Sequence, residues 1–91
     1  MMSQEKITSL LQEKFHPVYL NVVDESHKHA GHNLQAVAGG THFNVHIVST
    51  VFEGRKLIER HRLVYAAIGE EVGNQVHALA VIAKTPLEHN C

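Results

Sequence analysis

The sequence has one cysteine among its 91 residues, and that residue, Cys91, is the last of the chain. A single cysteine excludes an intramolecular disulfide. It also excludes a zinc or iron–sulfur site built only from cysteines of this chain. Any metal chemistry that needs thiolates would therefore require a partner that supplies them.

Long apolar runs are also missing. No stretch approaches the roughly 18 residues that a membrane-spanning helix needs. The N-terminus, MMSQEKITSLLQEKF, mixes charges with apolar residues at a helical period and has no continuous apolar region of the kind found in a signal peptide. With 44% hydrophobic and 19% charged residues, the chain is typical of a globular protein. We therefore expect a single domain over residues 1–91, located in the cytoplasm and not in contact with a membrane.

The chain has no marked excess of charge of either sign, since 8 basic and 9 acidic residues give a formal net charge of -1. This balance gives no general attraction to nucleic acid or to an anionic membrane. Histidine, by contrast, is abundant, with nine residues. Imidazoles change charge between about pH 5 and 8. The net charge should therefore respond strongly to mild acidification.

The spacing of apolar residues predicts five elements, in the order helix, strand, strand, helix, strand. They are a helix capped by Ser3 and ended by Pro17, strands at 18–26 and 41–49, a helix from about Lys56, and a strand at 75–85. Thr50 and Glu53 have the spacing of a capping box in a short turn that Gly54 can close. The strand at 75–85 is apolar on both faces, which is typical of a strand buried between others.

This order of elements predicts a particular topology. The second helix connects the second and third strands, and a right-handed crossover makes those two strands parallel. The first two strands form an antiparallel hairpin. We therefore expect an α+β fold, an αββαβ two-layer sandwich with a mixed three-stranded sheet and both helices on one face.

Three histidines cluster in the sequence SHKHAGHN, which lies in a stretch of about residues 26–40 that we expect to be a long exposed loop. They are His27, His29 and His32. One interpretation is a solvated polar loop. The other is a metal site, because imidazoles bind Zn²⁺, Cu²⁺ and Ni²⁺. A dedicated zinc site would usually add a cysteine or a carboxylate.

His61 interrupts an apolar stripe of the second helix that runs from Leu57 to Tyr65. It is either a histidine at the edge of the core that packs on these two residues, or an imidazole presented where the histidine-rich loop could reach it. Arg60 and Arg62 flank it. Because successive helical residues point about 100° apart, at most one of the two arginines is its near neighbour.

Four stretches, HAGH, THFNVHIVSTVFEG, ERHRLVYAAIGEEV and VHALAVIAKTP, together resemble the BolA-like family from about Val22 to Glu88. The resemblance implies a fold similar to the type II KH domain. It also implies a monothiol, CGFS-type glutaredoxin as the partner, with a [2Fe–2S] cluster bridging the two proteins. The implied role is non-enzymatic and serves iron–sulfur cluster trafficking or iron sensing. We expect the isolated chain to hold no cofactor and to be a monomer or a weak homodimer.

The resemblance also implies a set of cluster ligands. The glutaredoxin cysteine and a glutathione thiol supply two of the four. The helix histidine of the family falls on His61, and the ligand from the loop falls on His29, with His32 next. Two imidazoles replacing two thiolates on one iron is a known arrangement, and this chain can offer histidines only.

A DNA-binding transcriptional regulator of the stress or morphology response is the alternative, because the KH-like fold binds nucleic acid. A KH domain clamps the phosphate backbone with a GxxG loop, and no GxxG occurs in this sequence. Lys56, Arg60 and Arg62 could still form a local basic patch. No nucleophile with a placed base is evident, so we do not expect an enzyme. We expect His42, His46 and His77 to be ordinary strand histidines on a solvated or edge side.

Overall fold

The computed structural model describes residues 4–25, 42–69 and 78–90. The elements, in order, are α1 (Gln4–Phe15), β1 (Tyr19–Asp24), β2 (His42–Val48), the 3-10 helix η3 (Thr50–Phe52), α2 (Leu57–Ile68), β3 (Ala78–Lys84) and α3 (Pro86–His89). The predicted order of elements is confirmed, and the two short helices η3 and α3 are additions to it. The predicted Ser3 cap and the predicted loop at 26–40 lie outside the described residues.

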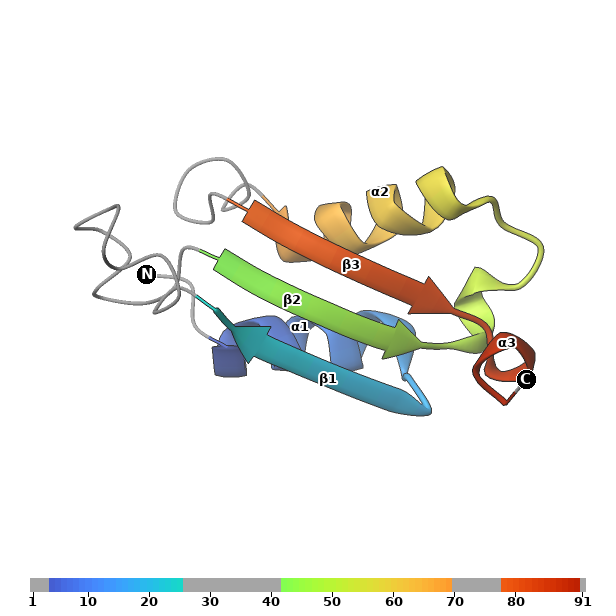
Figure 1. Cartoon of the computed structure of the whole chain (residues 1–91), viewed down its shortest axis with the longest axis horizontal. Coiled ribbons are helices and arrows are strands. Elements are labelled where there is room, and N and C mark those ends of the chain that lie inside the picture. The colour runs from blue at the N-terminus through green and yellow to red at the C-terminus, as the bar shows by residue number, and fades with distance from the viewer. Residues whose placement is uncertain (1–3, 26–41, 70–77, 91) are drawn as a thin grey trace.

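The sheet has the strand order β1-β2-β3. Strand β1 is antiparallel to β2 and β3 is parallel to it, so that Val45 lies opposite Val22 on one side and Val81 on the other. Figure 1 shows α1 and α2 behind the sheet, on the same face. The predicted α+β sandwich with a mixed three-stranded sheet is therefore confirmed. The likeness to a type II KH domain stays a prediction.

The expectation that the third strand lies between two others is wrong. In the described sheet β2 is central and β3 is an edge strand. The apolar residues on its second face do not meet another layer, since Ile82 keeps 47% of its surface exposed. An apolar pattern on both faces therefore marks here a partly uncovered strand and not a central one.

The core lies between the two long helices and the covered face of the sheet. Alternate residues of β2 (Phe43, Val45 and Ile47) point into it, as the sequence predicts. The helices and η3 complete it with Ile7, Leu11, Phe15, Phe52, Val64 and Ile68. None of the described helices has the length and apolar character needed to cross a membrane.

Helix α1 ends because the backbone turns left-handed at His16, whose φ is 44°. The His16 N–H donates to the Gln12 carbonyl at 3.1 Å, which is the pattern of a left-handed C-cap. Pro17 follows and cannot continue the helix. The chain then enters β1 at Tyr19, one residue later than predicted, and Val18 remains 66% exposed.

The turn after β2 is capped by Ser49 and not by the predicted pair of Thr50 and Glu53. The Ser49 hydroxyl accepts from the Val51 N–H at 3.2 Å and donates to the Phe15 carbonyl at 2.7 Å. Ser49 is buried, so this one side chain joins the start of η3 to the end of α1. Gly54 closes the turn with a φ of 74°, as expected.

Helix α2 buries a different face from the one predicted. The buried residues follow the spacing Arg60, Val64 and Ile68. Leu57 and Tyr65, which we expected to pack on the core, are 65% and 39% exposed. The period of the helix was read correctly, but two stripes share that period, and the one that faces the core contains Arg60 together with Val64 and Ile68.

Candidate functional site

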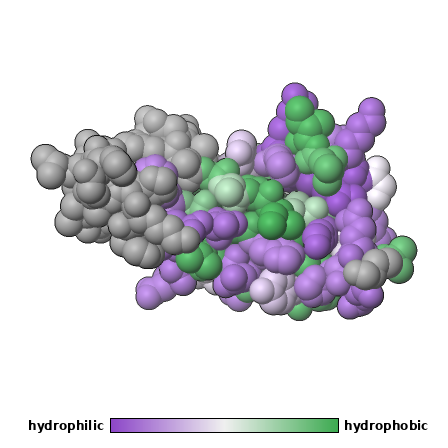
Figure 2. Space-filling model, viewed as in Figure 1, coloured by the Kyte–Doolittle hydropathy of each residue, from purple (hydrophilic) through white to green (hydrophobic). Residues whose placement is uncertain are grey.

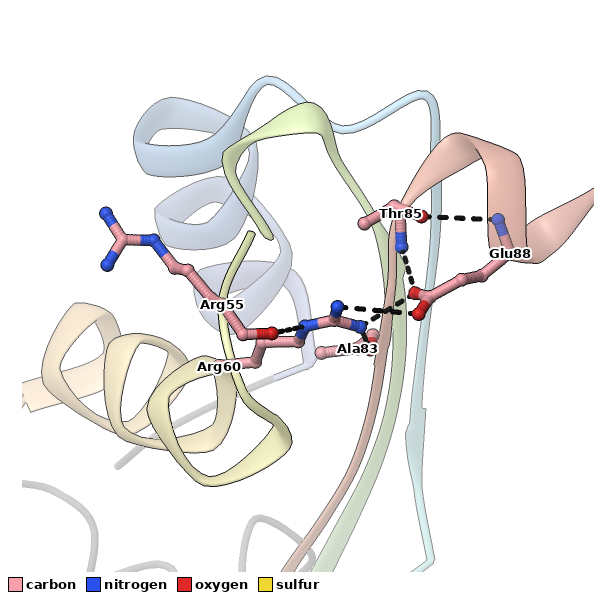
Figure 3. A network of polar contacts seen from close by, with 5 residues as sticks. All are labelled: Arg55, Arg60, Ala83, Thr85 and Glu88. Carbon is pink, nitrogen blue, oxygen red and sulfur yellow. Dashed lines mark hydrogen bonds and ion pairs between the residues drawn. The ribbon is translucent and has the colours of Figure 1, made fainter. Parts of the chain in front are cut away.

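The buried arginine of α2 anchors the helix to the C-terminal part of the chain (Figure 3). Arg60 is only 7% exposed. Its Nη1 donates to the Ala83 carbonyl at 3.1 Å and to Glu88 Oε1 at 2.7 Å. Its Nε donates to the Arg55 carbonyl at 3.0 Å. The guanidinium therefore ties α2 to β3, to α3 and to the turn that precedes α2.

The placement of Arg60 in an exposed basic patch is wrong for this reason. Its guanidinium is buried and occupied, so it does not extend from the surface toward a partner or toward nucleic acid. Arg62 and Lys56 are exposed, and their predicted role as contacts stays a prediction. The sequence carried a signal for this difference. Arg60 lies four residues before Val64 and eight before Ile68, on the buried stripe of α2, whereas Arg62 does not.

The four-residue helix α3 holds the carboxylate that Arg60 binds. The Thr85 hydroxyl accepts from the Glu88 N–H at 3.2 Å, and the Thr85 N–H donates to Glu88 Oε1 at 2.7 Å. Hydrogen bonds from Arg60 and then from Thr85 lower the pKa of Glu88 from 4.5 to about 2. The sequence carried the signal for α3, because Thr85 and Glu88 have capping-box spacing with Pro86 at the first helical position.

His61 lines a groove between α2 and β3. The groove has a volume of about 390 Å³ and is bounded by Leu57, Arg60 and His61 from the helix, residues 81–84 from the strand, and Glu88. His61 is partly exposed. This partial exposure fits both predicted alternatives, a histidine at the edge of the core and an imidazole presented at the surface. The structure presents this imidazole on the wall of an open, mainly apolar groove.

The two ends of the sheet differ in what the chain attaches to them (Figure 1). At the Lys84 end, β2 and β3 finish at Val48 and Lys84, and α3 follows. At the His42 end, β1 finishes at Asp24, and β2 and β3 begin at His42 and Ala78. His61 lies at the Lys84 end, since the groove contains the last residues of β3.

The predicted loop ligands belong to the segment between β1 and β2 in the sequence. His29 and His32 lie outside the described residues, in the segment that leaves β1 after Glu25 and rejoins β2 at His42. Strand β2 has seven residues, and at about 3.3 Å per residue it separates the two ends by roughly 20 Å. The described residues therefore do not bring His61 next to the ends of that segment.

The described residues do not form a metal site of their own. Across 4–25, 42–69 and 78–90, no group of three or more His, Cys, Asp or Glu side chains could hold a metal ion. A cluster held by this chain would therefore need ligands from the remaining residues or from a partner. The predicted ligand set stays a prediction.

A second histidine group lies on the uncovered face of the sheet and was not predicted. His89 of α3 stacks on Tyr19 of β1 with ring centroids 5.2 Å apart, and His46 of β2 meets both rings edge-on. Burial, the Lys84 ammonium and His89 lower the pKa of His46. Its Nε2 is buried and has no hydrogen-bond partner among the described residues. These rings hold α3 against the sheet.

The uncovered face faces the viewer in Figure 2. Hydrophobic side chains gather over the middle of the sheet and again at the edge where α2 begins, and hydrophilic side chains surround both areas. The exposed large apolar residues of α2 and β3 are Leu57, Ile58, Tyr65 and Ile82. Exposed apolar surface of this kind often marks an interaction site when it is contiguous.

Comparison with known proteins gives consistent relatives. Residues 11–88 match the family model described as BolA-like protein. The chain is 48% identical to "Protein BOLA1, chloroplastic" of Arabidopsis thaliana, over 86% of this chain and 50% of that protein. It is 43% identical to "DNA-binding transcriptional regulator BolA" of Escherichia coli K12, over 89% of this chain and 73% of that protein.

A solved structure agrees with the fold. The BolA domain of SufE1 from Arabidopsis thaliana superposes with a TM-score of 0.82 at 44% identity, and the match covers 93% of each chain. The chain spans about half the length of the chloroplastic relative. The likeness therefore concerns the domain, and activities of longer relatives do not follow from it.

Proposed function

The chain belongs to the BolA-like family, and from this premise we propose that it is a non-enzymatic partner of a monothiol glutaredoxin. In this proposal the two proteins share a bridging [2Fe–2S] cluster. The glutaredoxin cysteine and glutathione provide the thiolates, and histidines of this chain complete the four ligands. The complex serves cluster trafficking or iron sensing.

The supply of donor groups in this chain supports the proposal. It has nine histidines and one cysteine, so it can complete a cluster only by adding imidazoles to thiolates from elsewhere. The names of the family relatives reported above describe a regulator and a family member, and neither name describes an enzyme.

The second imidazole ligand, besides the one from the loop, has two candidates. Resemblance assigns it to His61, and the loop ligand to His29 or His32. His61 lines the groove that contains residues 81–84 of β3, toward the Lys84 end. His77 directly precedes Ala78, whose Cα pairs with that of His42. His61 and His77 are therefore both candidates for the second imidazole.

The test is to mix the chain with cluster-loaded monothiol glutaredoxin and glutathione and to record visible absorption and circular dichroism. We expect a new spectrum that weakens in His29→Ala or His32→Ala and in one of His61→Ala and His77→Ala. Measuring all four variants identifies which two histidines bind the cluster. Wild-type spectra in all four variants would contradict histidine ligation by this chain.

A pH series gives an independent readout. An imidazole must be neutral to bind iron, so the shared cluster should be lost or rearranged as the pH falls from 8 toward 5. Glutaredoxin loaded with its cluster in the absence of this chain is the control, since it has no imidazole ligands from this protein. Identical pH dependence with and without the chain would argue against the proposal.

DNA binding is the second candidate function, because the Escherichia coli relative is named a DNA-binding transcriptional regulator. In this chain Lys56 and Arg62 would contact the phosphate backbone from the start of α2. Binding to a DNA duplex should then fall steeply with salt and weaken in Lys56→Gln and Arg62→Gln. Salt-independent binding, or none below 100 mM salt, would remove this candidate.

A further inference from the structure

The outer edge of β3 is only partly occupied by α2. The Ser49 N–H donates to the Lys84 carbonyl, so the backbone groups of Lys84 point toward β2. Since these directions alternate along a strand, the N–H and C=O groups of Leu79, Val81 and Ala83 point outward. They form the free edge of the sheet.

Side chains of α2 cover the two ends of this edge. The Tyr65 hydroxyl donates to the Leu79 carbonyl at 3.3 Å, and Arg60 Nη1 donates to the Ala83 carbonyl at 3.1 Å. Between them, the backbone N–H and C=O of Val81 have no partner among the described residues. An unpaired N–H and C=O on one residue can bond both groups of one residue in an added antiparallel strand.

The groove beside Val81 offers apolar surface to such a strand. Leu57 and Ile82 line it and are 65% and 47% exposed. Leu57, His61 and Tyr65 form the outer stripe of α2, the apolar stripe that the sequence displays and that the core does not use. A strand added along β3 would lie against this stripe.

The charges at the groove distinguish between possible occupants. Lys84 and His61 line it, while its carboxylate, Glu88, is paired with Arg60. Among the residues that the structure describes, no other carboxylate lines the groove. Joining β3 edges of two copies would bring two such basic grooves together, which is unfavourable, whereas an acidic segment would be attracted.

We propose that this groove binds an extended, acidic segment of another protein, which adds as a fourth strand next to β3. One residue of the segment pairs with Val81 through both of its backbone groups. An apolar side chain beside it contacts Leu57, and a carboxylate one or two residues away lies near Lys84 and His61. This binding is independent of any cluster.

The probe for the test is the peptide acetyl-Thr-Val-Val-Glu-Glu-amide, followed by ¹H–¹⁵N spectra of the full chain. We expect saturable shifts at the Val81 amide and slower hydrogen exchange of that amide. The same peptide with both glutamates replaced by lysine should bind roughly fivefold more weakly or worse. A peptide with proline at the second valine lacks the N–H and should not bind.

Chain variants sharpen the test without touching the candidate cluster ligands. Leu57→Ala and Lys84→Glu should each weaken the peptide by about fivefold. The matched control is Lys14→Glu, because Lys14 is an exposed residue of α1. This variant should bind the peptide like the wild type. No shift at Val81 at millimolar peptide would overturn the proposal. Val81 protection that appears with rising protein concentration and no peptide would overturn it in favour of a second copy as the occupant.

Discussion

The two ends of the sheet are built differently. At the Lys84 end, the described residues include a buried arginine with four side-chain hydrogen bonds, a capped helix and a ring stack that holds that helix. At the His42 end, the sequence between β1 and β2 contains His27, His29 and His32, and His77 directly precedes β3. The Lys84 end therefore secures the fold, and the proposed loop ligands His29 and His32 belong to the segment that joins Glu25 to His42 in the sequence.

His61 shows why this distinction matters. By sequence it belongs with the histidines of the family motif, but in space it lies at the Lys84 end. Its neighbours there are an apolar groove and a free strand edge. A histidine at this place is well positioned for binding a polypeptide and less well positioned to meet an imidazole that enters at the His42 end.

The largest expected effect concerns the core at the Lys84 end. Phe52 is fully buried and packs on Phe15 with ring centroids 5.3 Å apart. Phe52→Ala should lower the free energy of unfolding by about 4 kcal/mol. Val23→Ala, near the His42 end and 39% exposed, should change it by about 0.5 kcal/mol or less. Urea denaturation measures both, and equal losses would contradict the comparison.

Arg60 should come next. Arg60→Leu leaves the Ala83 and Arg55 carbonyls without their donors, and these two losses should cost about 2 kcal/mol. Its neighbour provides the control, because Arg62 is exposed and Arg62→Leu should stay within about 0.5 kcal/mol of the wild type. If the two variants unfold at the same urea concentration, Arg60 does not anchor this end.

Glu88 makes stability at the Lys84 end depend on acid. Its pKa in the folded protein is about 2, below the ordinary value of 4.5. The carboxylate therefore contributes stability that is fully present above pH 4.5 and is lost as the pH falls through the folded pKa of about 2. Thermal unfolding of Glu88→Gln should lose less stability over this window than the wild type. Parallel curves would argue against the low pKa.

His46 should give a smaller effect at mildly acidic pH. Because burial, Lys84 and His89 lower its pKa, the neutral form is favoured in the folded protein. Stability is therefore present above the unfolded pKa of 6.5 and falls as the pH drops below that value. His46→Gln should flatten this part of the stability profile. A histidine titration by NMR with a midpoint at or above 6.5 would contradict the prediction.

Much of the fold followed from sequence periodicity, and the errors have physical reasons. Alternation in β2 and the crossover rule gave the parallel pairing of β2 with β3 correctly. The buried face of α2 was misjudged because Arg60 occupies a core position, where its charge is satisfied by Glu88 from 28 residues away. A partner so distant in sequence leaves no local pattern. The edge position of β3 was missed because apolar residues on both faces are typical of a central strand. An edge strand with exposed apolar residues such as Ile82 shows the same pattern.

The candidate site was predicted less completely. The resemblance supplied a glutaredoxin partner and histidine ligands, while the structure supplied the groove and the free backbone of Val81. The spacing of residues could not predict the groove or the free backbone of Val81. Both depend on which backbone groups of β3 are already bonded to β2 and to side chains of α2. The aromatic group of Tyr19, His46 and His89 was likewise invisible in the sequence, since three separate elements contribute to it.

The most direct test of the difference between the two ends is a map of amide signals in the shared complex. ¹⁵N-labelled chain is mixed with cluster-loaded glutaredoxin and glutathione, and the amide signals broadened by the paramagnetic cluster are identified. We expect loss of signals around Glu25, His42 and Ala78, with signals of Leu57 and Lys84 retained. Loss around Lys84 and His61 with an unaffected His42 end would contradict the account and return the second ligand to His61.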